Sequence, residues 1–252
     1  MITWEYALLL LAVGVIAGFV NTLAGGGSML TLPVLMLSGM PADLANATNR
    51  VSIWGQSAFG AMRFHQHQQL DVSAIIPVLI PTASGSLIGA LLASFLPLTF
   101  LKPALLIVMI FMALIMVIMP SVLEPGLDEI PFTLKQKPAG NVALFLSGIY
   151  GGFVQAGVGY ILLFSLTGIL RYHLVKANAL KMTATLIFST IALVVFIWRD
   201  QVLWIPGLIL CVGAIVGVQA SVWFALKAHQ KTLKWILLVM IFMTCLGAFF
   251  KK

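Results

Sequence analysis

The sequence predicts an all-α polytopic membrane protein that is built from two related halves. Of its 252 residues, 61% are hydrophobic and only 8% are charged, and the mean hydropathy is +1.10. Soluble domains carry about a quarter charged residues, so this chain has too much apolar surface for water. Its longer apolar runs match the roughly 20 residues that one membrane crossing needs. Inside a bilayer such runs satisfy their own backbone groups, which predicts helices.

The apolar segments form two sets with the same long, short, long, long, long order. We expect the first set at 5–24, 28–39, 44–62, 72–95 and 101–119. We expect the second set at 141–157, 160–170, 174–197, 202–226 and 232–249. A polar connection separates the sets, which predicts a first repeat at 1–120, a linker at 121–139 and a second repeat at 140–252. The first segment lacks a basic flank, so we expect a retained helix rather than a signal peptide.

Short motifs recur in the same order in both halves. Gly18-Phe-Val-Asn21 matches Gly152-Phe-Val-Gln155, and a glycine-rich break follows each time. Asn46-Ala-Thr-Asn-Arg50 matches Ala177-Asn-Ala-Leu-Lys181. Later, small residues stand four apart in both halves, a spacing that lets membrane helices approach closely: Gly85, Gly89 and Ala93, and Gly213, Gly217 and Ser221. These matches predict an internal duplication.

The loop charges predict that the two repeats are inverted. If each long and short pair returns to the side from which it enters, one side carries Arg63, Lys135, Lys137, Arg171, Lys176, Lys227, Lys231 and Lys234. The other side then keeps Lys102, Arg199, Lys251 and Lys252. If each pair makes a net crossing, the same charges divide evenly. The positive-inside rule favours the first arrangement, which places both termini outside the cytoplasm of a bacterial inner membrane.

The two short segments predict a binding site within the membrane. About a dozen helical residues cover less than 20 Å, too little for the hydrocarbon core. Each segment should therefore begin inside the membrane, after Gly25-Gly-Gly27 or Gly157-Val-Gly159. Paired broken helices indicate a carrier's binding site, and a helix start near Ser28 favours an anion. A hinge that binds no ligand is the alternative.

Polar residues line one face of the segment that follows each break. In the first half this face carries Asn46, Asn49, Arg50 and Ser57, and in the second half Asn178, Lys181, Thr185 and Ser189. The two cations lie about 9–10 Å inside their segments by helical rise. Because no carboxylate lies within a span, we expect the substrate to be their counter-ion. Snorkelling of the long side chains towards the interface is the alternative.

The predicted substrate site gathers the breaks and these polar faces. Its residues are Asn21, Thr22, Gly25, Gly26, Gly27, Ser28, Asn46, Asn49, Arg50, Gln155, Gly157, Gly159, Asn178 and Lys181. The expected partners are the lipid bilayer and a small anionic solute, and a homo-oligomer is compatible with the sequence. We expect no cofactor. No metal site is predicted, because His65-Gln-His67 lacks an acidic or cysteine partner, and the scattered basic residues argue against nucleic acid.

The first break and the segments after it resemble the TauE/SafE sulfite exporter family. The resemblance rests on Gly18-Phe-Val-Asn-Thr-Leu-Ala-Gly-Gly-Gly-Ser28, Leu32-Pro33 and Ala45-Asn-Ala-Thr-Asn-Arg50. It implies a permease for sulfur-containing anions such as sulfite, thiosulfate or organosulfonates. The second cluster, Gln155-Ala-Gly-Val-Gly159, is poorer in glycine than the family's usual form. The expected function is an exporting secondary carrier and not an enzyme. An anion channel, a non-transporting membrane subunit and an intramembrane enzyme are the alternatives.

Overall fold

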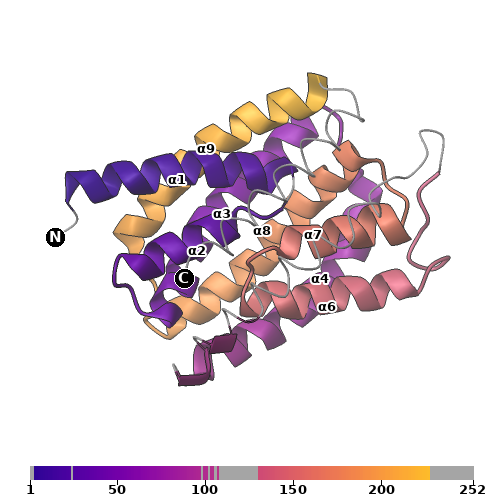
Figure 1. Cartoon of the computed structure of the whole chain (residues 1–252). Helices are drawn as coiled ribbons and strands as arrows, with labels where there is room; N and C mark the ends of the chain where they lie inside the picture. Colours follow the sequence, from indigo (N-terminus) through magenta and orange to yellow (C-terminus); the bar gives the residue numbers. More distant parts are fainter. Residues whose placement is uncertain are drawn as a thin grey trace.

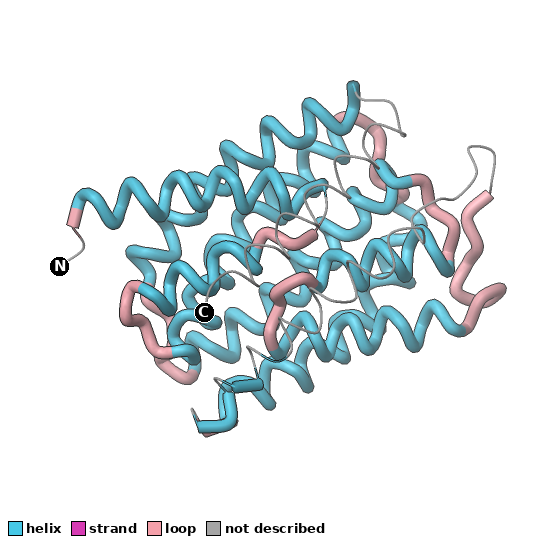
Figure 2. The backbone as a smooth tube through the Cα atoms, viewed as in Figure 1, coloured by secondary structure: helices cyan, strands magenta, loops and turns pink. Residues whose placement is uncertain are grey.

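The structure, a computed structural model, describes residues 3–23, 25–97, 99–101, 103, 104, 107 and 130–227. These residues form helices joined by turns and loops, without a strand (Figures 1 and 2). The all-α prediction is confirmed. The expected segment 232–249 lies outside the described residues, as does most of 101–119.

Four of the described helices are long and apolar enough to cross a membrane. They are α1 (Trp4–Leu23), α4 (Val72–Phe95), α8 (Leu174–Trp198) and α9 (Trp204–Lys227). A fifth, α3 (Ala42–Gln66), has 25 residues and is therefore about 38 Å long at 1.5 Å per residue. Its mid-helix amides and Arg50 are buried, because α2, α8 and α9 pack around it. The protein is therefore membrane-embedded, with a polar helix inside a layer of apolar ones.

Two short helices follow the glycine breaks, as the sequence predicts. α2 (Ser28–Leu37) has 10 residues, about 15 Å of helix. In the second half, α6 (Ala139–Phe153) precedes the break, and α7 (Val158–Leu163) continues as the π-helical η2 (Phe164–Ile169). The expected end of α6 at 157 is wrong.

The early end of α6 has a backbone cause. Gln155 and Gly157 both take positive φ angles, of 67° and 78°, which a right-handed helix cannot contain. In the first break Gly25 also takes a positive φ angle, of 87°. A positive φ angle therefore interrupts the helical backbone in both breaks.

Each broken pair of helices returns to the end of the molecule at which it starts. The Tyr6 hydroxyl, near the start of α1, lies 2.7 Å from the Ser38 hydroxyl at the end of α2. In the second half, the Phe132 N–H, before α6, donates to the Leu170 carbonyl after η2 over 2.8 Å. The pairs thus enter the helical layer and come back without crossing it.

The helices pack mainly across the two halves. α1 lies along α9, and α4 lies along α6 (Figure 1). The predicted small residues make these contacts: Gly85 and Gly89 of α4 lie against the backbone of Phe145 and Ile149 in α6. Gly213 and Gly217 of α9 lie in the same way against the backbone of α1. The prediction that these spacings mark close helix contacts is confirmed.

Equivalent helices of the two halves run in opposite directions. Within the pairs α1–α9 and α4–α6 the helices are parallel, since residue numbers rise together along each contact. α3 and α8 are antiparallel, because Gly60 approaches Met182 while Trp54 donates to Thr190. This is the geometry expected of inverted repeats. The repeat boundaries at 120 and 140 stay a prediction.

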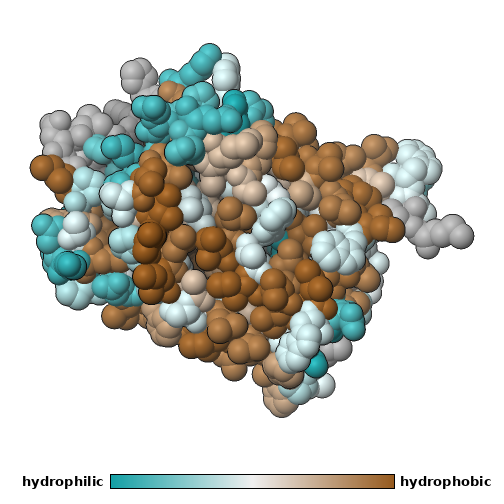
Figure 3. Space-filling view, turned by 180° about the vertical axis from the view of Figure 1, so that it is seen from behind, coloured by the Kyte–Doolittle hydropathy of each residue, from teal (hydrophilic) through white to brown (hydrophobic). Residues whose placement is uncertain are grey.

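The surface divides as a membrane protein requires. Seen from behind, apolar residues fill the broad middle of the molecule, and polar residues gather mainly at one end (Figure 3). The Tyr172 hydroxyl, 3.5 Å from Asp71, joins the loop before α8 to the loop before α4. The directions of α3, α8 and α9 place Arg63, Lys176 and Lys227 there too. This agrees with the sidedness that the loop charges predict.

We expect Gly25→Ala to destabilise the protein more than Gly39→Ala does. Both glycines have positive φ, of 87° and 90°, so both substitutions carry about 1–2 kcal/mol of backbone strain. A Cβ on Gly25 would also strike the backbone of Gly159, whereas a Cβ on Gly39 would meet nothing within 4 Å. Overpacking of this kind adds about 1–3 kcal/mol. Thermal unfolding in detergent measures the difference, and equal Tm values would contradict the contact.

Candidate functional site

The two helix breaks touch each other at the centre of the molecule. A Cβ on Gly25 would strike the Cα of Gly159, and a Cβ on Gly159 would strike the Cα of Gly25. The pairs Gly18/Gly152 and Gly25/Gly159 keep one constant spacing along the chain, so the contact joins equivalent positions of the repeats. Glycine is required at both, because each backbone occupies the place of the other's side chain.

Arg50 of α3 caps the end of α6, which belongs to the other half. Its Nη1 donates to the Gly151 carbonyl and to Oε1 of Gln155. Its Nη2 donates to the Gly152 carbonyl over 2.8 Å. The Phe196 ring lies 5.5 Å from the guanidinium carbon. One turn earlier, Asn46 Nδ2 donates to the next carbonyl of α6 over 2.9 Å.

Lys181 of α8 caps the end of α1 in the reciprocal way. Its Nζ lies 2.8 Å from the carbonyl oxygens of both Asn21 and Thr22, and 2.7 Å from Oδ1 of Asn178. The exposed fractions of Arg50 and Lys181 are 0% and 1%. Snorkelling towards the interface is therefore ruled out for both side chains in this structure. Each cation of one half instead holds the broken helix of the other.

These contacts bear on which groups compensate the charges of Arg50 and Lys181. Within the described residues neither cation has a carboxylate partner; helix-end carbonyls and side-chain amides accept instead. A helix C-terminus carries about half a negative charge, so each capped end compensates only about half of its cation. The helix ends thus share in balancing the two charges, and the substrate as their counter-ion stays a prediction.

The first turn of α2 lies beside the same polar face of α3. The Thr31 hydroxyl donates to Oδ1 of Asn49 over 2.7 Å, and Asn49 Nδ2 is buried without a partner among the described residues. Ser28 is buried at the start of α2. The ring of Tyr160 lies 2.9 Å from where a Cβ on Gly26 would stand. The start of α2 is thus enclosed by the second break.

The structure brings the predicted site residues to one region. The first break, the second break and the buried faces of α3 and α8 meet there. Gln155 joins α3 to α8, because its Oε1 accepts from Arg50 and its Nε2 lies 3.2 Å from the Ser189 hydroxyl. Gly27 packs closely on its own preceding helix, against Asn21, and Gly157 begins α7.

The profile of the family described as "Sulfite exporter TauE/SafE" matches residues 10–248. The chain belongs to this family. The match covers both breaks and both capping cations, so the geometry above is that of a TauE/SafE protein. The recognition made from the motifs of the first half is confirmed.

Curated TauE/SafE relatives match over nearly the whole chain. A "Probable membrane transporter protein" of Haemophilus influenzae is 25% identical over 235 residues, 93% of this chain and 91% of the relative. "Probable membrane transporter protein YfcA" of Escherichia coli (strain K12) is 28% identical over 222 residues, 88% and 81% of the two chains. The family and these relatives indicate a membrane transporter. No solved structure matches the chain significantly.

Sequence reasoning missed three contributors to this TauE/SafE site. The backbone carbonyls of Gly151 and Gly152 accept hydrogen bonds from Arg50, and the Thr31 hydroxyl donates a hydrogen bond to Asn49. Backbone acceptors cannot be identified from the sequence, because every residue type has a carbonyl group. Thr31 could have been found, since it stands one turn after Ser28 on the helix that begins at the break.

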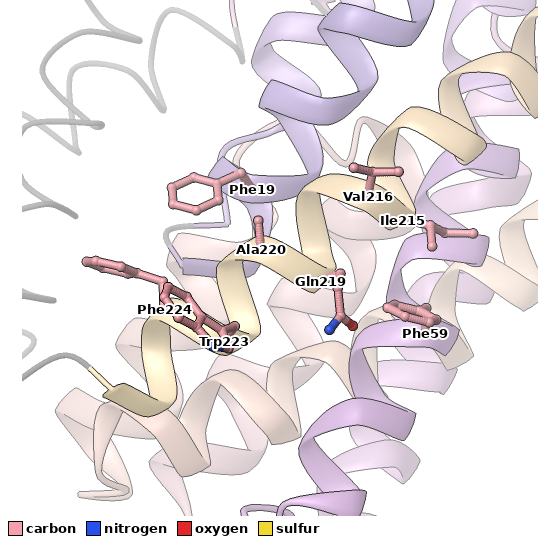
Figure 4. A pocket seen from close by; sticks show the side chains of 8 residues that line it. All are labelled: Phe19, Phe59, Ile215, Val216, Gln219, Ala220, Trp223 and Phe224. Atoms are coloured by element: carbon pink, nitrogen blue, oxygen red, sulfur yellow. The ribbon is translucent and has the colours of Figure 1, made fainter.

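An apolar groove of about 720 Å³ lies elsewhere, between α1, α3 and α9 (Figure 4). Phe19 and Phe59 line it from α1 and α3, and Trp223 and Phe224 from α9. Gln219 is its one polar lining residue. No cation is among the described residues that line this groove, so the candidate anion site stays at the breaks.

We expect Lys181→Met to destabilise the protein and Lys176→Met to leave its stability unchanged. Lys176 lies on the same helix and carries the same charge, but it is exposed. Losing Lys181 leaves buried carbonyls of Asn21 and Thr22 without a donor, at about 1–3 kcal/mol for each. Thermal unfolding in detergent measures both variants. A Lys181→Met protein as stable as wild type would show that the cap of α1 is dispensable.

Proposed function

We propose that the protein is a secondary carrier that exports small sulfur-containing anions, such as sulfite, thiosulfate or organosulfonates, across the bacterial inner membrane. The family description supports the class of solute. The paired broken helices support a carrier, because such pairs form the binding sites of secondary transporters. The solute would bind between the two breaks, beside Arg50, Lys181 and the start of α2.

One observation carries the proposal: two buried cations meet helix ends that compensate only about half of their charge. The acidic residues of the described part, Glu5, Asp43, Asp71 and Asp200, lie at or beyond helix ends. An uncompensated buried charge is costly, and a bound anion removes that cost. A cationic substrate would instead meet charges of its own sign and, among the described residues, no carboxylate inside a helix.

The region between the breaks is closely packed in this conformation. The start of α2 is buried beneath the second break, so a solute enters only when the two halves part on one side. Such alternating access suits two halves that hold each other through a few central contacts. Export of a singly charged anion from a cell at −100 mV gains about 2.3 kcal/mol, which can drive transport without a proton relay.

Flux into liposomes tests the proposal. Purified protein should take up labelled sulfite or thiosulfate with saturation and counterflow. Arg50→Ala should lower the flux by at least about tenfold, which equals about 1.4 kcal/mol. The matched control is Arg63→Ala, on the same helix but partly exposed at its end, which should keep the wild-type flux.

Two results would contradict the carrier. Flux indifferent to both Arg50→Ala and Lys181→Ala would remove the proposed charge role. Single-channel currents without counterflow would show an anion channel in place of a carrier.

A further inference from the structure

The two capping cations have different numbers of hydrogen-bond donors to spare. An ammonium has three N–H donors, and Lys181 meets three acceptors: two carbonyls of α1 and Oδ1 of Asn178. Its donors are all used. A guanidinium has five N–H donors, and Arg50 meets three acceptors within the described residues. Two of its N–H groups are left.

The unused N–H groups of Arg50 belong to Nε and Nη2. Nη1 uses both of its hydrogens, on Gly151 and Gln155. Nη2 uses one, on Gly152, and Nε is buried without a partner among the described residues. Nε and Nη2 are the two nitrogens of the side edge of the planar group, the edge that matches two oxygens of a carboxylate, phosphate or sulfonate.

A further unused donor lies on the neighbouring residue. Asn49 is fully buried, and its Nδ2 lacks a partner among the described residues although Thr31 holds its Oδ1. Its amide therefore stands between α3 and the first turn of α2. Buried polar groups are rarely left unpaired in folded proteins. Two unpaired donors on consecutive residues, beside a helix N-terminus, indicate an acceptor that binds there.

We infer that Arg50, and not Lys181, is the residue that binds the transported anion directly, through its side edge and with help from Asn49. Lys181 then acts as a positioning residue, which holds the end of α1 and adds charge at a distance. The ligand class is an anion with two or more oxygens on one atom, rather than a halide. This inference rests on the proposed function and names the chemistry of its site.

The variant Arg50→Lys distinguishes direct binding of the anion by Arg50 from a contribution of its charge alone. A lysine at position 50 keeps the charge and has three N–H groups. The three protein acceptors at that place would use all of them, so no N–H group would be left for an anion. Ligand-dependent thermal stabilisation, titrated with sodium sulfite, sodium methanesulfonate and sodium chloride at constant ionic strength, gives the affinities. We expect wild type to bind the two oxyanions in preference to chloride. Arg50→Lys should weaken oxyanion binding by about tenfold and lose that preference.

Lys181→Arg is the matched comparison, because it keeps the charge and removes no donor. It should bind the oxyanions within about threefold of wild type. If Lys181→Arg and Arg50→Lys weaken binding equally, or if Arg50→Lys keeps the preference over chloride, the inference is overturned while the proposed function stands. If wild type neither binds nor transports any of the oxyanions, the proposed function fails and this inference falls with it.

Asn49→Leu keeps the inference testable if Arg50→Lys does not fold. It removes the unpaired N–H, so oxyanion affinity should fall by about fivefold or more. Its control is Gln56→Leu, on the same helix, where the buried unpartnered atom is the acceptor Oε1. Gln56→Leu should leave the affinity unchanged, and equal affinities of the two variants would contradict the role given to Asn49 and the Arg50 edge.

Discussion

The structure depends on buried cations that cap broken helices across the two halves. A helix that ends inside an apolar layer leaves its last four carbonyls without intrahelical partners, and no water is present there to replace them. Lys181 supplies donors to the end of α1, and Arg50 supplies them to the end of α6. Each cap comes from the opposite half. Neither half therefore completes its own broken helix, and the two must assemble for either break to be stable.

The crossed caps also explain why the breaks lie at the centre. Because Gly25 and Gly159 occupy each other's side-chain space, the two breaks form one polar region rather than two. A movement of one half against the other changes the cap of both helices at once. Coupling between a bound solute and the opening of either side needs a shared element of this kind. The close glycine contacts of α1 with α9 and of α4 with α6 join the two halves along two further pairs of helices.

Much of the fold could be predicted from composition and motif. The bounds of α4 agree with the expected 72–95, and the broken pairs and basic positions were found from their repetition. Hydropathy missed the last turn of α3, because Arg63 and His65 are polar although the helix continues to Gln66. It also missed the end of α6, which Gln155 sets through an unusual φ for a non-glycine residue. The crossed caps could not be predicted, since their acceptors are backbone carbonyls that any residue type provides.

The most direct test of the central claim is to locate a bound anion by its anomalous scattering. Selenite presents the same pyramidal arrangement of three oxygens as sulfite, and selenium identifies its position in crystals of the protein. The account predicts a selenium peak at the crossing of the breaks, with its oxygens at hydrogen-bond distance from Nε of Arg50, while Lys181 keeps its bonds to α1. A peak in the groove lined by Phe19 and Trp223, or one held by Lys181 with the Arg50 contacts unchanged, would contradict it.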